Sequence, residues 1–269
     1  MRGRKGRAVQ AADLDRHMRS VGHWVDWSTT VDTFKFGDPS AEVQGIAVAW
    51  MSLQRALEEA SAAGCDLFVT HEPTFYAHRD DDPTVFEHEH ARRKRAFLER
   101  TGLVVYRCHD VWDRMPEVGI VDSWRRGLEL GGRLVATAPF YAVLEREPLA
   151  VSALAEHVAR RVRPLGQGSV QVVGDPEKLV SRIAVGTGAI TNVIQMTELG
   201  GEALIVTDDG IRFWQGGSWA IDAGIPLIVV NHATAEEWGM QSLARYLAEQ
   251  FPRVPVRHLP QGCMYRTAP

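Results

Sequence analysis

Three parts of the chain place a histidine within four residues of a carboxylate. The pairs are His71 with Glu72, His109 with Asp113, and His232 with Glu236. Imidazole nitrogens and carboxylate oxygens are the ligands that zinc, manganese, iron and nickel commonly use in proteins. Six such groups exceed the three or four that one catalytic zinc ion needs. The set therefore predicts one or two divalent ions, bridged by a carboxylate if there are two.

Each pair follows a predicted buried strand. The apolar runs at 65–70, 103–106 and 225–230 are short and bounded by polar residues, as in strands that are covered on both faces. After the first run, Pro73 cannot continue the ladder of hydrogen bonds, so the chain must turn at the histidine. Ligands of open α/β sheets collect beyond the carboxyl ends of the strands, which favours a functional role for polar residues at these places.

The pairs also have an ordinary structural interpretation. His71 and Glu72 could simply be polar residues of a solvated turn. His232 and Glu236 lie about 40° apart on a helical wheel, close enough to hold one ion. Thr234 could instead cap this helix, with the glutamate favouring its positive start. Repetition of the arrangement after three strands favours the metal site.

Strand and helix signals alternate along nearly the whole chain, which predicts an α/β (α+β layered) fold. We expect two α/β subdomains: a metal-binding one at 1–135 plus 225–269, and a smaller one at 136–224 inserted into it. Beyond the three strands above, strands are expected at 45–50, from residue 140, at 170–173, 183–188, 203–207 and 254–256. Helices are expected at 53–63, 91–100, 121–130, 148–162, 193–199 and 236–250.

The composition excludes several classes of protein. A net charge of -4 over 269 residues gives no general reason to bind nucleic acid, so a small-molecule partner fits better. Three distant cysteines without a CxxC pair favour reduced thiols and argue against a cysteine-type zinc site or an iron–sulfur cluster. No apolar run reaches the roughly 18 residues of a membrane span, and a signal-peptide core is absent. We therefore expect a soluble cytoplasmic protein with no membrane partner.

Some segments have weaker signals. The basic residues 1–7 could be a nucleic-acid arm but are more often a solvated terminus, and the basic run 92–95 is expected on the water-facing side of a helix. His78, His88 and His90 could add a ligand, although a solvated loop is favoured. The remaining signals are a weak phosphate-binding turn at Gly186-Thr187-Gly188, a simple turn at Asp208-Asp209-Gly210, and a small buried residue beside the site at Cys108.

With these motifs the chain resembles the Nif-three-like dinuclear-metal family, the GTP cyclohydrolase 1 type 2 homologues, over nearly its whole length. That family has a strand ending in His-His-Pro, another ending in His-Thr-Asn-Leu-Asp, and a late Gly-His-Tyr-Ala-Thr-Glu. The counterparts here are residues 71–73, 109–113 and 231–236. Residues 182–188 and 207–209 are similar to the family's Val-Ala-x-x-x-Gly and Thr-Gly-Asp.

The resemblance implies a metal-dependent hydrolase that opens a purine ring in a nucleotide such as GTP. It also implies a toroidal homohexamer with metal sites facing an internal cavity. The implied metal ligands are His71, Asp113, His232 and Glu236, with Glu72 at the place of the family's second histidine. The implied catalytic groups are Glu236 and a pocket histidine, His109, acting as general acid or base or orienting a ligand.

The chain departs from the family pattern at this second histidine. Glu72 adds a negative charge, which should shift the site toward manganese, iron or magnesium and away from zinc or copper. Asn231 in place of glycine and Trp112 near the site point to a divergent branch. Two other functions stay open: a non-enzymatic metal-binding scaffold that serves protein interactions, and a phosphoesterase that uses the same centre.

Overall fold

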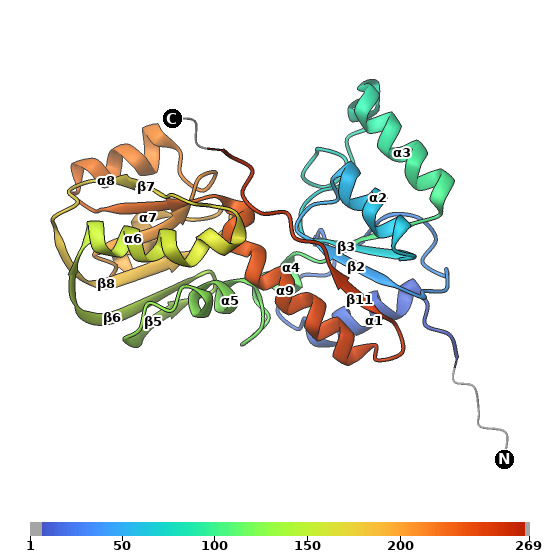
Figure 1. Cartoon of the computed structure of the whole chain (residues 1–269), viewed down its shortest axis with the longest axis horizontal. Helices are drawn as coiled ribbons and strands as arrows, with labels where there is room; N and C mark the ends of the chain where they lie inside the picture. Colours follow the sequence, from blue (N-terminus) through green and yellow to red (C-terminus); the bar gives the residue numbers. More distant parts are fainter. Residues whose placement is uncertain (1–6, 267–269) are drawn as a thin grey trace, which may run out of the picture. The chain divides into compact units, whose positions relative to one another are not determined.

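The computed structural model describes residues 7–266 and divides into two units (Figure 1). The first unit contains the chain up to Met115 together with Met240–Pro260, and the second contains Pro116–Gly239 and the chain from Gln261. Both units are mixed α/β, so the predicted fold class is confirmed. Of the basic N-terminal segment, residues 1–6 lie outside the described part of the chain.

The first unit is built on a five-stranded sheet in the order β1-β4-β3-β2-β11, in which β1 is antiparallel to β4 and the other strands are parallel. The strands are β1 (Phe34–Phe36), β2 (Ile46–Ala49), β3 (Leu67–Thr70), β4 (Val104–Arg107) and β11 (Val256–His258). The helices are α1 (Ala11–Val21), α2 (Gln54–Ala62), η1 (Pro83–Glu87), α3 (Glu89–Thr101) and α4 (Asp110–Asp113).

The carboxyl ends of β3 and β4 lie side by side in this sheet. The two strands are parallel neighbours, and Thr70 stands opposite Arg107 in their register. Every residue of both strands is buried, which explains why both are apolar up to their last residues, Thr70 and Arg107. Phe68 of β3 packs with Leu57 and Leu98 of the covering helices, and burying a side chain of this size contributes roughly 1.5–3 kcal/mol. The register delivers the residues after both strands to the same edge.

The second unit is built on a six-stranded sheet in the order β5-β6-β8-β9-β10-β7, in which β8, β9 and β10 are parallel. The strands are β5 (Arg133–Ala138), β6 (Tyr141–Ala150), β7 (Gln171–Val173), β8 (Leu179–Gly186), β9 (Ala203–Thr207) and β10 (Leu227–Val230). The helical segments are α5 (Ile120–Gly127), α6 (Val151–Val162), η2 (Arg163–Leu165), α7 (Val193–Glu198), η3 (Phe213–Gly217) and α8 (Ser218–Asp222).

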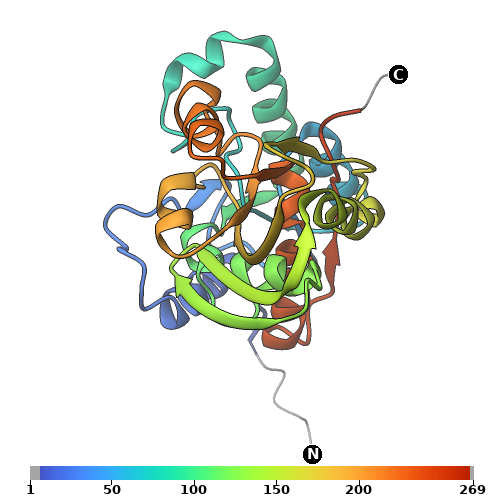
Figure 2. The ribbon, with the colours of Figure 1, turned by 90° about the vertical axis from the view of Figure 1, so that its left-hand side faces the viewer.

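This second sheet is covered on both faces. Along β9, Ile205 packs in one apolar cluster with Trp124 of α5 and Leu154 of α6, whereas Leu204 packs in the other with Met196 of α7. Alternation of neighbouring residues between faces follows from the period of two in a strand. The antiparallel β5–β6 pair is visible in light green in Figure 2.

Helix α9 (His232–Gln250) begins directly after β10, with residues 232–239 in the second unit and 240–250 in the first. It begins four residues earlier than expected, so Thr234 lies within the helix and does not cap it. The predicted strand at 225–230 is present but pairs with β9. The chain passes from one unit to the other after residues 115, 239 and 260.

One other detail differs from the sequence-based expectations. Pro148 was expected in a helix, but it lies in β6, where the register with β8 shifts between Glu145 and Leu149. Strand proline is tolerated at such irregularities. Among residues 7–266, no helix combines the length and apolarity needed to cross a membrane.

Candidate metal centre

The first unit brings three of the predicted site residues together. His71 follows β3 and His109 follows β4, and their rings stack with centroids 4.5 Å apart. Asp113, at the end of α4, places one carboxylate oxygen 3.3 Å from His71 Nε2 and the other 3.4 Å from His109 Nδ1. One potential ligand atom from each residue lies within 4.8 Å of the others. We refer to His71, His109 and Asp113 as the first half-site.

The hydrogen bonds of His71 fix its tautomer. Its Nδ1 lies 3.0 Å from the carbonyl oxygen of Cys108, and because a carbonyl can only accept, this nitrogen carries the proton. In the neutral ring, Nε2 then presents a lone pair toward the Asp113 carboxylate. Two acceptors facing each other repel unless a proton or a cation lies between them. This arrangement fits a divalent ion, with the backbone carbonyl orienting the ligand.

His109 is surrounded by negative charge. Burial alone would lower its pKa, but the charge of Asp113 and the 2.9 Å hydrogen bond from Nδ1 to Asp110 raise the pKa of His109 to about 9. The ring therefore carries a proton at neutral pH in the metal-free protein. A cation is favoured at this position, whether it is the imidazolium itself or a bound metal ion.

Asp32 supports the first half-site, although the sequence did not single it out. This carboxylate is fully buried and accepts hydrogen bonds from the backbone amides of residues 109, 110 and 111 at 2.8, 2.8 and 2.9 Å. Burial raises the pKa of Asp32, and the amide hydrogen bonds oppose this effect. Asp32 thereby holds the turn that presents His109 and starts α4.

Glu72 is oriented by a buried arginine. Its carboxylate lies 3.4 Å from Nη2 of Arg107, whose Nε donates to the backbone oxygen of His71 at 2.8 Å. Arg107 is fully buried at the end of β4. The guanidinium balances the extra charge that distinguishes Glu72 from a histidine, so a carboxylate at this position does not remain uncompensated.

The second unit contains the other predicted pair. His232 Nε2 lies 3.0 Å from Oε1 of Glu236, one turn later in α9. The Nδ1 of His232 lies 2.8 Å from an oxygen of Asp209, which can only accept, so Nδ1 is protonated. Thr187 donates to the same oxygen of Glu236 at 3.2 Å. We refer to His232 and Glu236 as the second half-site.

The second half-site repeats the electrostatic arrangement of the first. In the neutral tautomer, Nε2 of His232 and Glu236 are again two acceptors facing each other. Burial would lower the pKa of His232, but the charges and hydrogen bonds of Glu236 and Asp209 raise it well above its ordinary value. A carboxylate that fixes one histidine nitrogen while the other faces a ligand oxygen is the usual surrounding of a metal-binding histidine.

Asp208 and Asp209, which follow β9 and were expected only to form a simple turn, contact the residues at the start of α9. Asp208 accepts from the backbone amide of His232 at 3.0 Å and from Asn231 Nδ2 at 2.8 Å. Asp209 orients the histidine ring. Their position directly after β9 could have indicated this role from the sequence. The strand is parallel to β10, with Thr207 opposite Val230, so the residues that follow both strands lie at the same edge of the sheet.

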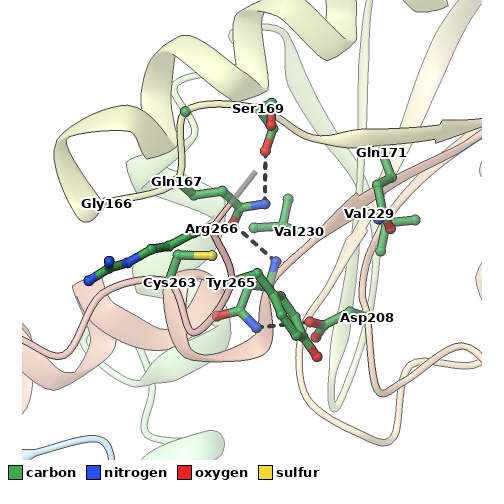
Figure 3. Close-up of a pocket in the computed structure, with 12 residues that line it drawn as sticks. Gly166, Gln167, Ser169, Gln171, Asp208, Val229, Val230, Cys263, Tyr265 and Arg266 are labelled. Atoms are coloured by element: carbon green, nitrogen blue, oxygen red, sulfur yellow. Dashed lines mark hydrogen bonds between the residues drawn. The ribbon is translucent and has the colours of Figure 1, made fainter. Parts of the chain in front are cut away.

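A polar cavity of about 680 Å³ adjoins this acidic pair in the second unit (Figure 3). Gln167 lies within it and accepts from the backbone amide of Asn231 at 3.1 Å. Asp208 lines the cavity and also accepts the backbone amide of His232 at the start of α9. The lining is Gly166, Gln167, Gly168, Ser169, Gln171, Asp208, Val229, Val230, Asn231, Cys263, Tyr265 and Arg266.

The weaker sequence signals are mostly ordinary in the structure. His78, His88 and His90 are exposed, as favoured, and Cys108 is buried beside His71. The turn at Gly186-Thr187-Gly188 has a structural role that the sequence did not indicate. The backbone oxygen of Gly188 accepts a hydrogen bond from the Thr207 hydroxyl at 2.7 Å. The turn therefore helps to hold the residues around the second half-site.

The sequence matches a known family over most of its length. The profile described as Duf34/NIF3 (NGG1p interacting factor 3) matches residues 29–261. A Chlamydia pneumoniae protein named GTP cyclohydrolase 1 type 2 homolog is 23% identical over 222 residues, covering 80% of this chain and 84% of that protein. A Pseudomonas aeruginosa protein of the same name is 26% identical over 227 residues, covering 82% and 84%.

Solved structures share the fold. A Bacillus cereus protein related to NIF3 superposes with a TM-score of 0.78 at 12% identity, covering 98% of this chain and 99% of that one. A Staphylococcus aureus protein gives a TM-score of 0.77 at 16% identity, covering 97% and 100%. The resemblance noted in the sequence motifs is thus confirmed by the family profile and by the fold: the chain belongs to the Duf34/NIF3 family.

Proposed function

We propose that the protein is a metal-dependent hydrolase with a dinuclear centre that uses one or two divalent ions per chain. The observation that carries this proposal is the same in both half-sites: a histidine whose Nδ1 donates to a fixed acceptor turns Nε2 toward a carboxylate oxygen, at 3.3 Å in one case and 3.0 Å in the other. When bound, a zinc, manganese, iron or nickel ion supplies Lewis-acid polarisation of the substrate and lowers the pKa of water.

The protein groups have distinct roles in this proposal. His71 and Asp113 hold an ion in the first unit, with Glu72 as a further ligand, and His232 and Glu236 hold one in the second. His109 and Glu236 are the catalytic groups, because each can carry a proton at the site. The raised pKa of His109, to about 9, suits a general acid at neutral pH.

The substrate is a small molecule, and a purine nucleotide is our first candidate. The names of the Chlamydia and Pseudomonas relatives support it, as does the polar cavity beside Asp208, whose volume of about 680 Å³ is typical of ligand pockets. A phosphoester is the second candidate. The near-neutral charge balance disfavours nucleic acid, and three free cysteines fit a cytoplasmic location.

The test is a turnover screen on the full chain, purified without chelator and with its metal content measured. Purine nucleoside triphosphates and phosphoesters are the substrates, and ring opening or phosphate release is the signal. We expect turnover that stops after chelation and returns with added metal. A metal-loaded protein that turns over none of these substrates would contradict the hydrolase.

The alternative function is a metal-binding scaffold for protein interactions. Glu236→Ala separates the two functions, because a catalytic glutamate is needed for turnover and not for assembly. Loss of turnover with an unchanged oligomer supports the enzyme. Disassembly of the oligomer, without native turnover, supports the scaffold.

Replacing Glu72 by histidine is expected to raise the preference for zinc over manganese by about tenfold, because an imidazole nitrogen suits zinc better than a harder carboxylate does. The measurement is competitive loading with equal amounts of both metals, followed by metal analysis. Glu72→Gln is the matched control, since it removes the charge that pairs with Arg107 without adding an imidazole. A zinc-to-manganese ratio equal to that of the wild type in Glu72→His would exclude Glu72 as a ligand.

We also propose that the chain assembles as a toroidal homohexamer, in which the exposed apolar residues of η3 and α8 are covered. Phe213 and Trp214 of η3 are 76% and 70% exposed, and Ile221 of α8 is 53% exposed. Phe213→Ser combined with Trp214→Ser is expected to reduce the mass measured by light scattering, whereas Leu179→Ser, at another exposed apolar position, is not. An unchanged mass in the double variant would place the interface elsewhere.

A further inference from the structure

Lys94 is the exception in the basic run of α3. Arg92, Arg93 and Arg95 are exposed, as expected for a water-facing side, but Lys94 is only 2% exposed. Buried lysines are rare unless they are paired with an acid. The Nζ of Lys94 instead donates to the backbone oxygen of Thr74 at 2.8 Å, so its position calls for a chemical explanation.

The loop facing Lys94 is held in an unusual conformation. Tyr76, whose ring centroid lies 4.5 Å from the Lys94 Nζ, has a positive φ of 66°, and Asp80 has a φ of 58°. The Asp80 carboxylate accepts from the backbone amides of Thr74 and Phe75 and so fixes this loop. Positive φ is an uncommon conformation for residues other than glycine, and such residues concentrate at functional sites.

Lys94 lines a cavity of about 180 Å³ in the first unit. The residues around it are mostly apolar, and no carboxylate is among them: Met51, Ser52, Leu53, Pro73, Tyr76, Ala77, His78 and Lys94. An apolar protein cavity of roughly 150 Å³ can hold a benzene molecule. The space next to Lys94 therefore suits a compact, uncharged organic molecule.

The surroundings also make Lys94 a better nucleophile than an ordinary lysine. Burial lowers the pKa of Lys94 to about 8, and the charge of Asp80 opposes this only in part. The titratable groups around Lys94 in this part of the chain are Asp80, whose charge acts on the amine, Tyr76, whose ring lies against it, and His78, which lines the same cavity. At pH 7 about one tenth of such an amine is neutral, against about three in ten thousand for an ordinary lysine.

We propose that Lys94 is a covalent binding site for small apolar aldehydes, which it captures as an imine in this cavity. The neutral Nζ attacks the carbonyl carbon, a proton moves from nitrogen to oxygen to give the carbinolamine, and this loses water to form the C=N bond. No oxidant, reductant or metal takes part. The site is separate from the proposed hydrolase, and its test does not depend on turnover.

The experiment treats the full chain with benzaldehyde and sodium cyanoborohydride, which reduces the imine to a stable benzyl amine. The chain has four lysines, Lys5, Lys35, Lys94 and Lys178, so peptide mapping resolves each rate. We expect Lys94 to be labelled about ten times faster than Lys178 near pH 7, since a desolvated lysine in an apolar pocket is an activated nucleophile. Toluene, which has the same ring without the carbonyl, should slow only the labelling of Lys94.

A cavity-filling variant separates the pocket from mere reactivity. Ala77→Leu should slow labelling of Lys94 by benzaldehyde while leaving its methylation by formaldehyde nearly unchanged, because formaldehyde does not need the cavity. Equal benzaldehyde rates at Lys94 and Lys178 would overturn the proposal. So would fast labelling of Lys94 that neither toluene nor Ala77→Leu reduces.

Discussion

Replacing Asp32 by alanine is expected to lower the free energy of unfolding by about 3–5 kcal/mol and to abolish metal retention by the first half-site. The carboxylate accepts three backbone hydrogen bonds at the turn that carries His109. The substitution leaves all three backbone amides without this acceptor. A buried donor left unsatisfied costs roughly 1–3 kcal/mol. Denaturant unfolding and metal analysis of the same preparation measure the two effects.

Asp32→Asn should give a graded result. One oxygen of Asp32 accepts from residues 109 and 110 and the other accepts from Val111, so an amide group can replace the first oxygen but not the second. We expect a loss of about 1–3 kcal/mol. Asp38→Ala is the control, because Asp38 also accepts a backbone amide, that of Ser40, but in an exposed loop. A stability of Asp32→Ala equal to that of Asp38→Ala would contradict the role assigned to Asp32.

Replacing Asp209 by asparagine is expected to weaken metal binding to the second half-site by about 10–100-fold, the usual effect of removing the partner of a ligand histidine. The Asp209 carboxylate holds Nδ1 of His232 at 2.8 Å and makes the opposite nitrogen a stronger ligand. Titration of the metal-depleted chain with a competing chelator measures the affinity. Fold and unfolding midpoint should stay close to those of the wild type, because Asp209 is half-exposed.

The control for this variant is Asp175→Asn, which alters an exposed carboxylate of the same unit that accepts the amide of Glu177. It should leave the affinity unchanged. His232→Ala should cause a larger loss than Asp209→Asn, since it removes a ligand and not its support. Equal affinities in Asp209→Asn and the wild type would exclude the proposed orientation of His232.

The sequence was most informative where local pattern decides structure. The buried strands β3, β4 and β10 have apolar runs bounded by polar residues, so their carboxyl ends and the histidines that follow could be located directly. The register of Thr70 opposite Arg107 then brings His71 and His109 into contact, as parallel neighbours require. The pairing of His232 with Glu236 follows from helical spacing alone.

Supporting residues were missed because their role depends on tertiary contacts. Asp32 lies 77 positions before the amide of His109 that it accepts, and no local pattern distinguishes it from a loop aspartate. Lys94 stands in a run of arginines, so only its burial against Thr74 separates it from them. Division of the chain between the two units also depends on long-range pairing, because β10 joins the sheet of β9.

The metal content of the full chain decides whether the two half-sites bind divalent ions. The protein is purified without chelator, and the bound divalent ions per chain are counted by elemental analysis for the wild type, His71→Ala and His232→Ala. We expect at least one ion per wild-type chain and a clear loss in each variant, with the fold retained by circular dichroism. Less than one ion per chain, unchanged by either substitution, would contradict this expectation.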